Sequence, residues 1–311
     1  MTNKFRLFAG SANPALAELV ANQLRAPLSP RVIERFPDGE ASVRIEESVR
    51  GCEVFIIQPT APPVDERVME LLIFADACRR AAAARITAIV PYFGYARQDR
   101  RRGQRAPVTA SMVAQLMQVV GINQVMSVDI HADQLEGFFQ VPMDALTATP
   151  ALCEALQPDL PPGAVVVSPD VGRVGMATEY ARRLKSSVVV LHKHRESGSR
   201  TTVTHVVGDV AGRPCLIIDD MISTGGTIRR AIEALLGAGA RPEITIAATH
   251  GVFVAGAREA LSHPSVRGVY VTDSIPVNTE GWERLRVVSV APLLAEAIER
   301  IREDGSLSGL R

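Results

Sequence analysis

Two neighbouring carboxylates followed by a small, hydroxyl-rich loop form the stretch of this sequence with the clearest chemistry. Asp219 and Asp220 follow a short apolar run at 216–218, which is typical of a strand buried on both faces. Open α/β sheets bind ligands at the carboxyl ends of such strands. The loop that comes next contains Ser223, Thr224, Gly225, Gly226 and Thr227.

A helix is expected from 228, so the backbone amides of this loop would lie at its positive end, where anions bind. Gly225 and Gly226 allow the backbone to come close to a ligand. The pattern therefore predicts a sugar-phosphate site, with carboxylates for vicinal hydroxyls and the loop for the phosphate. A tight turn without function is the alternative. A Walker A loop is excluded, because no lysine follows the glycines.

A second polar cluster begins where a strand predicted at 85–92 ends. Aromatic side chains within 92–95 lead into Arg97, Gln98 and Asp99, and more arginines follow up to position 105. Arginine can bind a phosphate with two hydrogen bonds or stack on a base. The segment is therefore a candidate nucleotide site, and a solvated basic loop or an RNA contact is the alternative.

Single ionisable residues also follow other predicted strands. His131 follows a strand at 124–129, and Asp170 follows one at 165–167. A lone histidine is more often a structural hydrogen-bonding residue than a ligand, but nearby aspartates are compatible with a metal or phosphate role. The turn at 36–40 carries Phe36, Asp38 and Glu40, and on its own it is typical of a solvated hairpin.

Two cations end the strand that is predicted to begin at 188. Lys193 and Arg195 precede the polar, glycine-containing segment 196–200, which we expect to be mobile. Such a pair could close over a polyphosphate and neutralise charge in a transition state. An ordinary basic hairpin is the alternative reading of the same residues.

Strands and helices alternate along the whole chain, which predicts an α/β fold with mainly parallel sheets between helical layers. The pattern restarts after 147, and the densest proline cluster follows at 158–163. The pair of strands at 54–58 and 86–90 resembles the pair at 215–219 and 244–248, which indicates two related halves unless any two such units look alike. We expect two domains, 1–147 and 148–311.

Composition limits the classes of protein and of partner. The chain has 311 residues, 47% hydrophobic and 22% charged, enough for a substantial core. Its formal net charge of +0 disfavours a general nucleic-acid surface. The four cysteines form no CxxC pair, which favours a reduced, cytoplasmic setting. We expect no signal peptide and no membrane partner, because no run approaches about 20 apolar residues.

Together these segments resemble the ribose-phosphate diphosphokinases, also called phosphoribosyl pyrophosphate synthetases, in order and spacing over nearly the full length. The motifs that carry the resemblance are Phe-Pro-Asp-Gly-Glu at 36–40, Glu-Ser-Val-Arg-Gly at 47–51, Met-Glu-Leu-Leu-Ile at 69–73, Tyr-Ala-Arg-Gln-Asp at 95–99, Arg-Ala-Pro at 105–107, Asp-Ile-His-Ala at 129–132, Gly-Phe-Phe at 137–139, Ser-Pro-Asp at 168–170, Lys-His-Arg at 193–195, the 219–227 loop and Thr-His-Gly at 249–251.

The resemblance implies two phosphoribosyltransferase-like domains, and it allows the last helix to pack back on the first. It implies a homo-oligomer, often a hexamer, that transfers the diphosphoryl group of ATP to ribose 5-phosphate. By this resemblance, ATP would contact Arg97, Gln98 and Asp99, and also Phe36, Asp38 and Glu40 of a neighbouring subunit. Mg²⁺ would contact His131 and Asp170, and Lys193 and Arg195 would act on the diphosphoryl group. Asp219 and Asp220 would hold the ribose, and Ser223, Thr224, Gly225, Gly226 and Thr227 the 5-phosphate.

Several departures from the family pattern bear on this reading. Arg173 stands where a glycine is common, and it would either take over a phosphate contact or crowd the site. Ser223 stands where many members have aspartate. Departures around 101–104 leave open whether phosphate and ADP regulate the protein and how broad the diphosphoryl donor is. One rival reading is a type I phosphoribosyltransferase, which would share the 219–227 loop but would not need the segment 97–99 or the Lys193 loop. The other is a non-catalytic regulatory subunit, which would have lost site residues present here.

Overall fold

A computed structural model describes residues 4–101, 103–195 and 201–311, without the side chains of 193–195 and 201–204. The chain forms two compact units. The first unit comprises residues up to 147 together with 274–276 and 289–311, and the second comprises 148–273 and 277–288. The C-terminal helix thus belongs to the first unit, although the chain reaches it only after the second.

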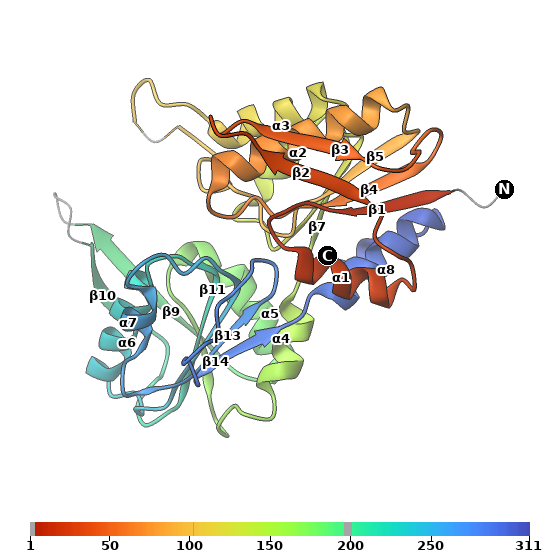
Figure 1. Ribbon diagram of the computed structural model, residues 1–311. Helices are drawn as coiled ribbons and strands as arrows, with labels where there is room; N and C mark the ends of the chain where they lie inside the picture. The colour runs from red at the N-terminus through yellow and green to blue at the C-terminus, as the bar shows by residue number, and fades with distance from the viewer. Residues whose placement is uncertain (1–3, 102, 196–200) are drawn as a thin grey trace. The chain divides into compact units, whose positions relative to one another are not determined.

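The first unit is built on a five-stranded parallel sheet (Figure 1). Its strands, in spatial order, are β1 (Phe5–Ala9), β4 (Glu53–Ile57), β5 (Arg85–Ile89), β6 (Gln124–Val128) and β7 (Met143–Leu146). Helices α2 (Val64–Arg80) and α3 (Thr109–Val119) cover one face, and α1 (Pro14–Gln23) packs with α8 (Ala291–Arg302) on the other. Every residue of β4 is buried, as expected of a strand covered on both faces.

A separate antiparallel hairpin, β2 (Arg31–Arg35) and β3 (Ala41–Ile45), belongs to the same unit. Strand β3 packs against α2, and the turn between the strands carries Phe36, Asp38 and Glu40. Gly39 adopts φ +96° in this turn, a conformation that glycine takes without steric cost. The turn predicted at 36–40 is confirmed.

The second unit contains a seven-stranded sheet that is parallel except at one edge. Its strands, in spatial order, are β10 (Thr201–Val207), β9 (Val188–Arg195), β8 (Val165–Ser168), β11 (Cys215–Ile222), β12 (Ile244–Gly251), β13 (Val266–Thr272) and β14 (Leu285–Val288). Among the described strands of this sheet, only β10 runs antiparallel to its neighbour, β9. Helices α6 (Gly226–Gly237) and α7 (Ala257–Leu261) lie on one face, and α4 (Thr149–Leu156) packs with α5 (Val174–Leu184) on the other.

The predicted fold class is confirmed, since both sheets are mainly parallel and flanked by helices. Some bounds differ from the expectation. The strand predicted to end at 218 continues to Ile222, because its pairing with β12 continues to Gly251. Asp219 and Asp220 therefore lie within β11, not after it. Helix α5 begins at Val174, after the short 3-10 turn η2 (Val171–Arg173).

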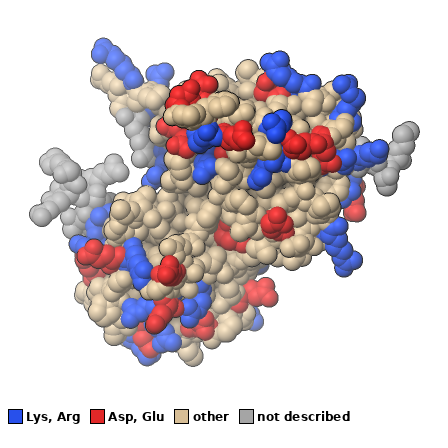
Figure 2. All heavy atoms as spheres, viewed as in Figure 1, with Lys and Arg blue, Asp and Glu red and all other residues tan. Residues whose placement is uncertain are grey.

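All four cysteines are free and buried. Burial raises the pKa of the Cys78 thiol to about 12 and that of Cys215 to about 11, so both are weak nucleophiles. Figure 2 shows basic and acidic side chains interspersed over the face in view. Within the part of the chain that the structure describes, no helix combines the length and the apolar character that crossing a membrane requires.

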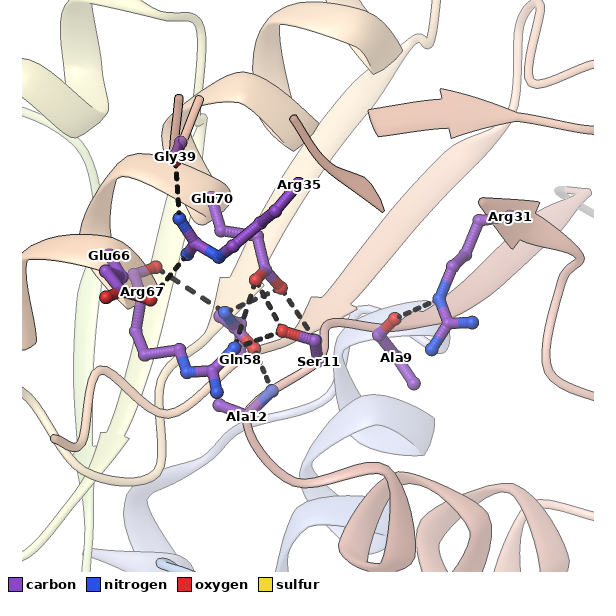
Figure 3. A network of polar contacts seen from close by, with 10 residues as sticks. All are labelled: Ala9, Ser11, Ala12, Arg31, Arg35, Gly39, Gln58, Glu66, Arg67 and Glu70. Carbon is purple, nitrogen blue, oxygen red and sulfur yellow. Dashed lines mark hydrogen bonds and ion pairs between the residues drawn. The ribbon is translucent and has the colours of Figure 1, made fainter. Parts of the chain in front are cut away.

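One buried carboxylate ties together the ends of two strands of the first unit (Figure 3). Glu70 on α2 is only 1% exposed. It accepts hydrogen bonds from the Ser11 amide at 2.7 Å, from the Ser11 hydroxyl and from Gln58 Nε2 at 2.9 Å, and it pairs with Arg67 at 3.2 Å. Ser11 follows β1 and Gln58 follows β4 directly, so Glu70 fixes the carboxyl edge of this sheet to α2.

Replacing Glu70 with alanine is expected to destabilise the first unit by about 3 kcal/mol, because several buried donors and the Arg67 charge lose their partner. The measurement is hydrogen–deuterium exchange of amides in β1 and β4, compared with the parent chain. Glu66→Ala is the matched control. Glu66 lies on the same helix and pairs with Arg35 at 2.9 Å while half exposed, and such pairs contribute at most about 1 kcal/mol. Equal losses of protection in the two variants would contradict the role given to Glu70.

Candidate active site

The acid pair lies on β11, between β8 and β12 in the sheet of the second unit. The side chain of Asp220 is 2% exposed and that of Asp219 is 14% exposed. Asp219 Oδ1 accepts a hydrogen bond from the Asp220 amide at 2.9 Å. The two carboxylates are therefore largely removed from water, and one of them is oriented by its own strand.

Arg173 bridges the two carboxylates. Its Nε lies 3.4 Å from Asp219 Oδ1, and its Nη2 lies 3.0 Å from Asp220 Oδ2. Arg173 ends the turn η2, whose first amides are capped by Asp170, since Asp170 Oδ1 accepts a hydrogen bond from Gly172 N at 3.0 Å. The two roles that the sequence suggested for Arg173 were a phosphate contact and crowding, and the structure adds a third, as counter-ion of the acid pair.

The electrostatics of the pair follow from this arrangement. The pKa of Asp219 is raised well above the usual range. Burial is the main cause, and the neighbouring charge of Asp220 is the next. The Arg173 guanidinium lowers the pKa of the same carboxyl and so opposes both effects. The protonation of the pair therefore depends on a residue outside the 219–227 loop.

The loop from Ser223 to Gly225 leads directly into α6, which begins at Gly226. Gly225 has φ +73°, and a Cβ atom there would lie 3.0 Å from Ala260 Cβ and 3.3 Å from the Ala257 carbonyl on α7. Only glycine combines this conformation with such close packing. The loop thus brings the amides at the start of a 12-residue helix next to the end of β11, an arrangement suited to a phosphate.

The predicted nucleotide residues lie after β5, between that strand and α3. Arg97 and Gln98 are exposed, and Gln98 Oε1 accepts a hydrogen bond from the Thr109 hydroxyl at 2.6 Å. Asp99 is buried. It pairs with Arg100 at 2.8 Å and accepts a hydrogen bond from Gln134 Nε2 at 2.5 Å.

These contacts give Asp99 a structural part in this segment. Arg100, by hydrogen bonding and by its charge, lowers the pKa of Asp99, and His131 acts on it more weakly in the same direction. The structure therefore brings Asp99 near His131 within the first unit. Asp99 fixes the path of the chain that carries Arg97.

The hairpin residues that are predicted to contact the nucleotide all lie on the surface. Phe36 is 50% exposed, and Asp38 and Glu40 are exposed beside it. Asp38 Oδ1 accepts a hydrogen bond from the Glu40 amide at 3.1 Å, which closes the turn.

The remaining predicted residues are divided between the two units. His131 follows β6 in the first unit, and Asp170 follows β8 in the second. Among the described residues, no group of three or more His, Cys, Asp or Glu side chains is arranged to hold a metal. Lys193 and Arg195 lie near the end of β9, which pairs with β10, but their side chains and the segment 196–200 lie outside the described residues.

Sequence comparison shows which known proteins this chain is similar to. The family model of the N-terminal domain of ribose phosphate pyrophosphokinase matches residues 5–121, and that of the phosphoribosyl synthetase-associated domain matches residues 198–311. A ribose-phosphate pyrophosphokinase of Gloeobacter violaceus is 44% identical, covering 99% of this chain and 93% of that protein. One of Shewanella oneidensis is also 44% identical, over 98% of each chain.

A crystal structure gives the same result for the fold. Phosphoribosylpyrophosphate synthetase from Mycobacterium smegmatis matches with a TM-score of 0.90 at 40% identity, covering 97% of this chain and 100% of that one. The two family models match different parts of the chain, and the relatives match nearly all of it. The chain belongs to the ribose-phosphate pyrophosphokinase family.

Proposed function

We propose that the protein is a ribose-phosphate pyrophosphokinase that uses ATP and ribose 5-phosphate. The anomeric hydroxyl oxygen forms a bond to the β-phosphorus of ATP, the bond from that phosphorus to the α,β-bridging oxygen breaks, and the hydroxyl proton is lost. The products are phosphoribosyl pyrophosphate and AMP. The observation that carries the proposal is family membership over the whole length, together with an acid pair and a helix-start loop on β11.

In this proposal the second unit binds the sugar phosphate. Asp219 and Asp220 accept hydrogen bonds from the vicinal hydroxyls of the ribose. The loop residues bind the 5-phosphate through backbone amides and hydroxyls. The buried setting of both carboxylates supports this role, because a buried acceptor discriminates strongly against a ligand that lacks the matching hydroxyl.

The nucleotide is assigned to the first unit, with Arg97 and Gln98 at the base and phosphates. Phe36, Asp38 and Glu40 would contact the adenine of a neighbouring subunit in a homo-oligomer, often a hexamer in the family. The hairpin is exposed, and its side chains are therefore accessible to another subunit. The free, buried cysteines are compatible with a reducing cytoplasm as the place of the reaction.

Mg²⁺ is the metal we assign, and His131 and Asp170 are the residues that we propose as candidate ligands. Imidazole nitrogen and carboxylate oxygen are donors that fit a divalent cation. Mg²⁺ at phosphate-transfer sites usually keeps several waters and takes few protein ligands. When bound, it supplies positive charge to the polyphosphate. Lys193 and Arg195 add charge from the protein, and catalysis rests on positioning and on that charge.

One assay tests the proposal, namely ³¹P NMR of the protein with ATP, Mg²⁺ and ribose 5-phosphate. We expect AMP and a sugar with a new diphosphoryl group at the anomeric position. Pyrophosphate release only when a base and the activated sugar are supplied would instead show a type I phosphoribosyltransferase. A protein inactive under both conditions would be a regulatory subunit, and the proposal would be wrong.

A further inference from the structure

Arg173 gives the sugar site a feature that the 219–227 loop alone does not contain. Its guanidinium contacts one oxygen of each carboxylate, at 3.4 Å for Asp219 and 3.0 Å for Asp220. None of the three side chains is more than 15% exposed. The ion pairs therefore form out of bulk water, where they are stronger than surface pairs.

Two carboxylates on successive residues in a buried setting repel each other, and one of them tends to take up a proton. Arginine is suited to oppose this and to hold both groups in place, because it stays charged and its planar fork can contact two oxygens at once. A lysine would place a single point charge there. Asp220 and Arg173 are the charged groups that act on Asp219, in opposite directions.

We propose that Arg173 is a positioning residue of the sugar site, which holds the carboxyl groups of Asp219 and Asp220 in place so that both accept hydrogen bonds from the vicinal hydroxyls of ribose 5-phosphate. This inference rests on the proposed function. With this role for Arg173, the vicinal hydroxyls of the ribose (the diol) determine the choice of substrate as well as the phosphate. Arg173 is placed for this by η2, which contacts both β9 and β11.

The same contacts allow an opposite role, in which the guanidinium fills the place of the sugar and must be displaced. The two roles differ in the sign of one measurement. Removing a positioning residue weakens ribose 5-phosphate binding, whereas removing a competitor strengthens it. The experiment therefore decides between them.

The test compares Arg173→Gln and Arg173→Lys with the parent chain. We expect Arg173→Gln to raise both the KM and the calorimetric Kd for ribose 5-phosphate by about 10- to 100-fold, the loss typical of a hydrogen bond to a charged group. The KM for ATP should change less than about threefold. Arg173→Lys should recover part of the affinity, because it restores the charge without the fork. Arg182→Gln is the matched control, since Arg182 forms an exposed pair with Glu179 on α5.

A second readout separates positioning from a general effect on folding. The preference for ribose 5-phosphate over 2-deoxyribose 5-phosphate should decrease in Arg173→Gln, because the two carboxylates are no longer held where they accept hydrogen bonds from both vicinal hydroxyls. An unchanged preference, or an unchanged or lower KM for ribose 5-phosphate, overturns the inference. If Arg173→Gln does not fold, the affinity for ribose 5-phosphate and the preference over 2-deoxyribose 5-phosphate are measured in Arg173→Lys, and they decide the question. If the parent chain forms AMP and Arg173→Gln binds ribose 5-phosphate as tightly as the parent chain, only the role of Arg173 is refuted. If the parent chain neither binds ribose 5-phosphate nor forms AMP, the proposed function is refuted as well.

Discussion

Replacing Lys193 with alanine is expected to lower the rate of AMP formation by about 100- to 1000-fold while ribose 5-phosphate still binds. Phosphoryl transfer depends chiefly on in-line positioning and on neutralising negative charge that is spread over the phosphate oxygens. Removing one donor that acts only in the transition state typically costs a factor of this size. Because the proposed sugar-binding residues lie on β11 and in its loop, we expect them to be unaffected.

The measurement combines kcat from AMP release with calorimetric binding of ribose 5-phosphate. Lys4→Ala is the control, since Lys4 is an exposed lysine before β1 in the other unit. We expect it to change kcat less than twofold. A Lys193→Ala variant with the kcat of the parent chain would remove Lys193 from the mechanism. A variant that lost ribose 5-phosphate binding as well would show that Lys193 acts on the ground state instead.

The parallel sheets could be predicted because buried strands of this kind are nearly continuous apolar runs. Strand β4 is buried at every position, and so is β12. The strands β7 and β14 were missed, and both are short, with four residues each at an edge of its sheet. Helix α7, with five residues, is too short to show a 3.6-residue period. Apolar runs and hydrophobic periodicity therefore do not predict an element that is short or half exposed.

The bounds of β11 illustrate a second limit. The apolar run ends at 218, and a prediction from hydrophobicity alone therefore ends the strand at that residue. The backbone continues in register with β12 to Gly251, because strand pairing is a property of the main chain and tolerates polar side chains. A sequence pattern reports burial of side chains, and it reports backbone pairing only indirectly.

For the site, the local spacing predicted which residues stand together on one strand and its loop. It could not predict contacts between segments far apart in the chain. Arg173 and the acid pair are such a case, and so is the contact of Asp99 with Gln134. The departure of Arg173 from the family pattern was the only available signal, and it marked the position without giving its partner. Long-range partners follow from topology, here from η2 contacting β11.

Asp220→Asn is expected to lower kcat/KM for ribose 5-phosphate by roughly 100-fold. The substitution keeps the shape of the side chain and removes its charge, which leaves Arg173 facing a neutral amide in a buried setting. Breaking a buried pair by removing one partner costs several kcal/mol, of which about 3 kcal/mol corresponds to this loss of rate. Asp209→Asn is the control, because Asp209 is an exposed aspartate of the same unit, and we expect a change below twofold.

The double variant Asp220→Asn with Arg173→Gln tests whether the two residues act through each other. Residues in direct contact give non-additive effects, whereas independent sites add within about 0.5 kcal/mol. We expect the double variant to be less impaired than the sum of the two single changes, because the second substitution removes a buried guanidinium that has already lost one of its two carboxylate partners. Additive losses in kcat/KM would mean that Arg173 does not act through Asp220. An additive result with a normal preference for the diol would place the sugar hydroxyls on other residues and would contradict the assignment of β11 as the ribose site.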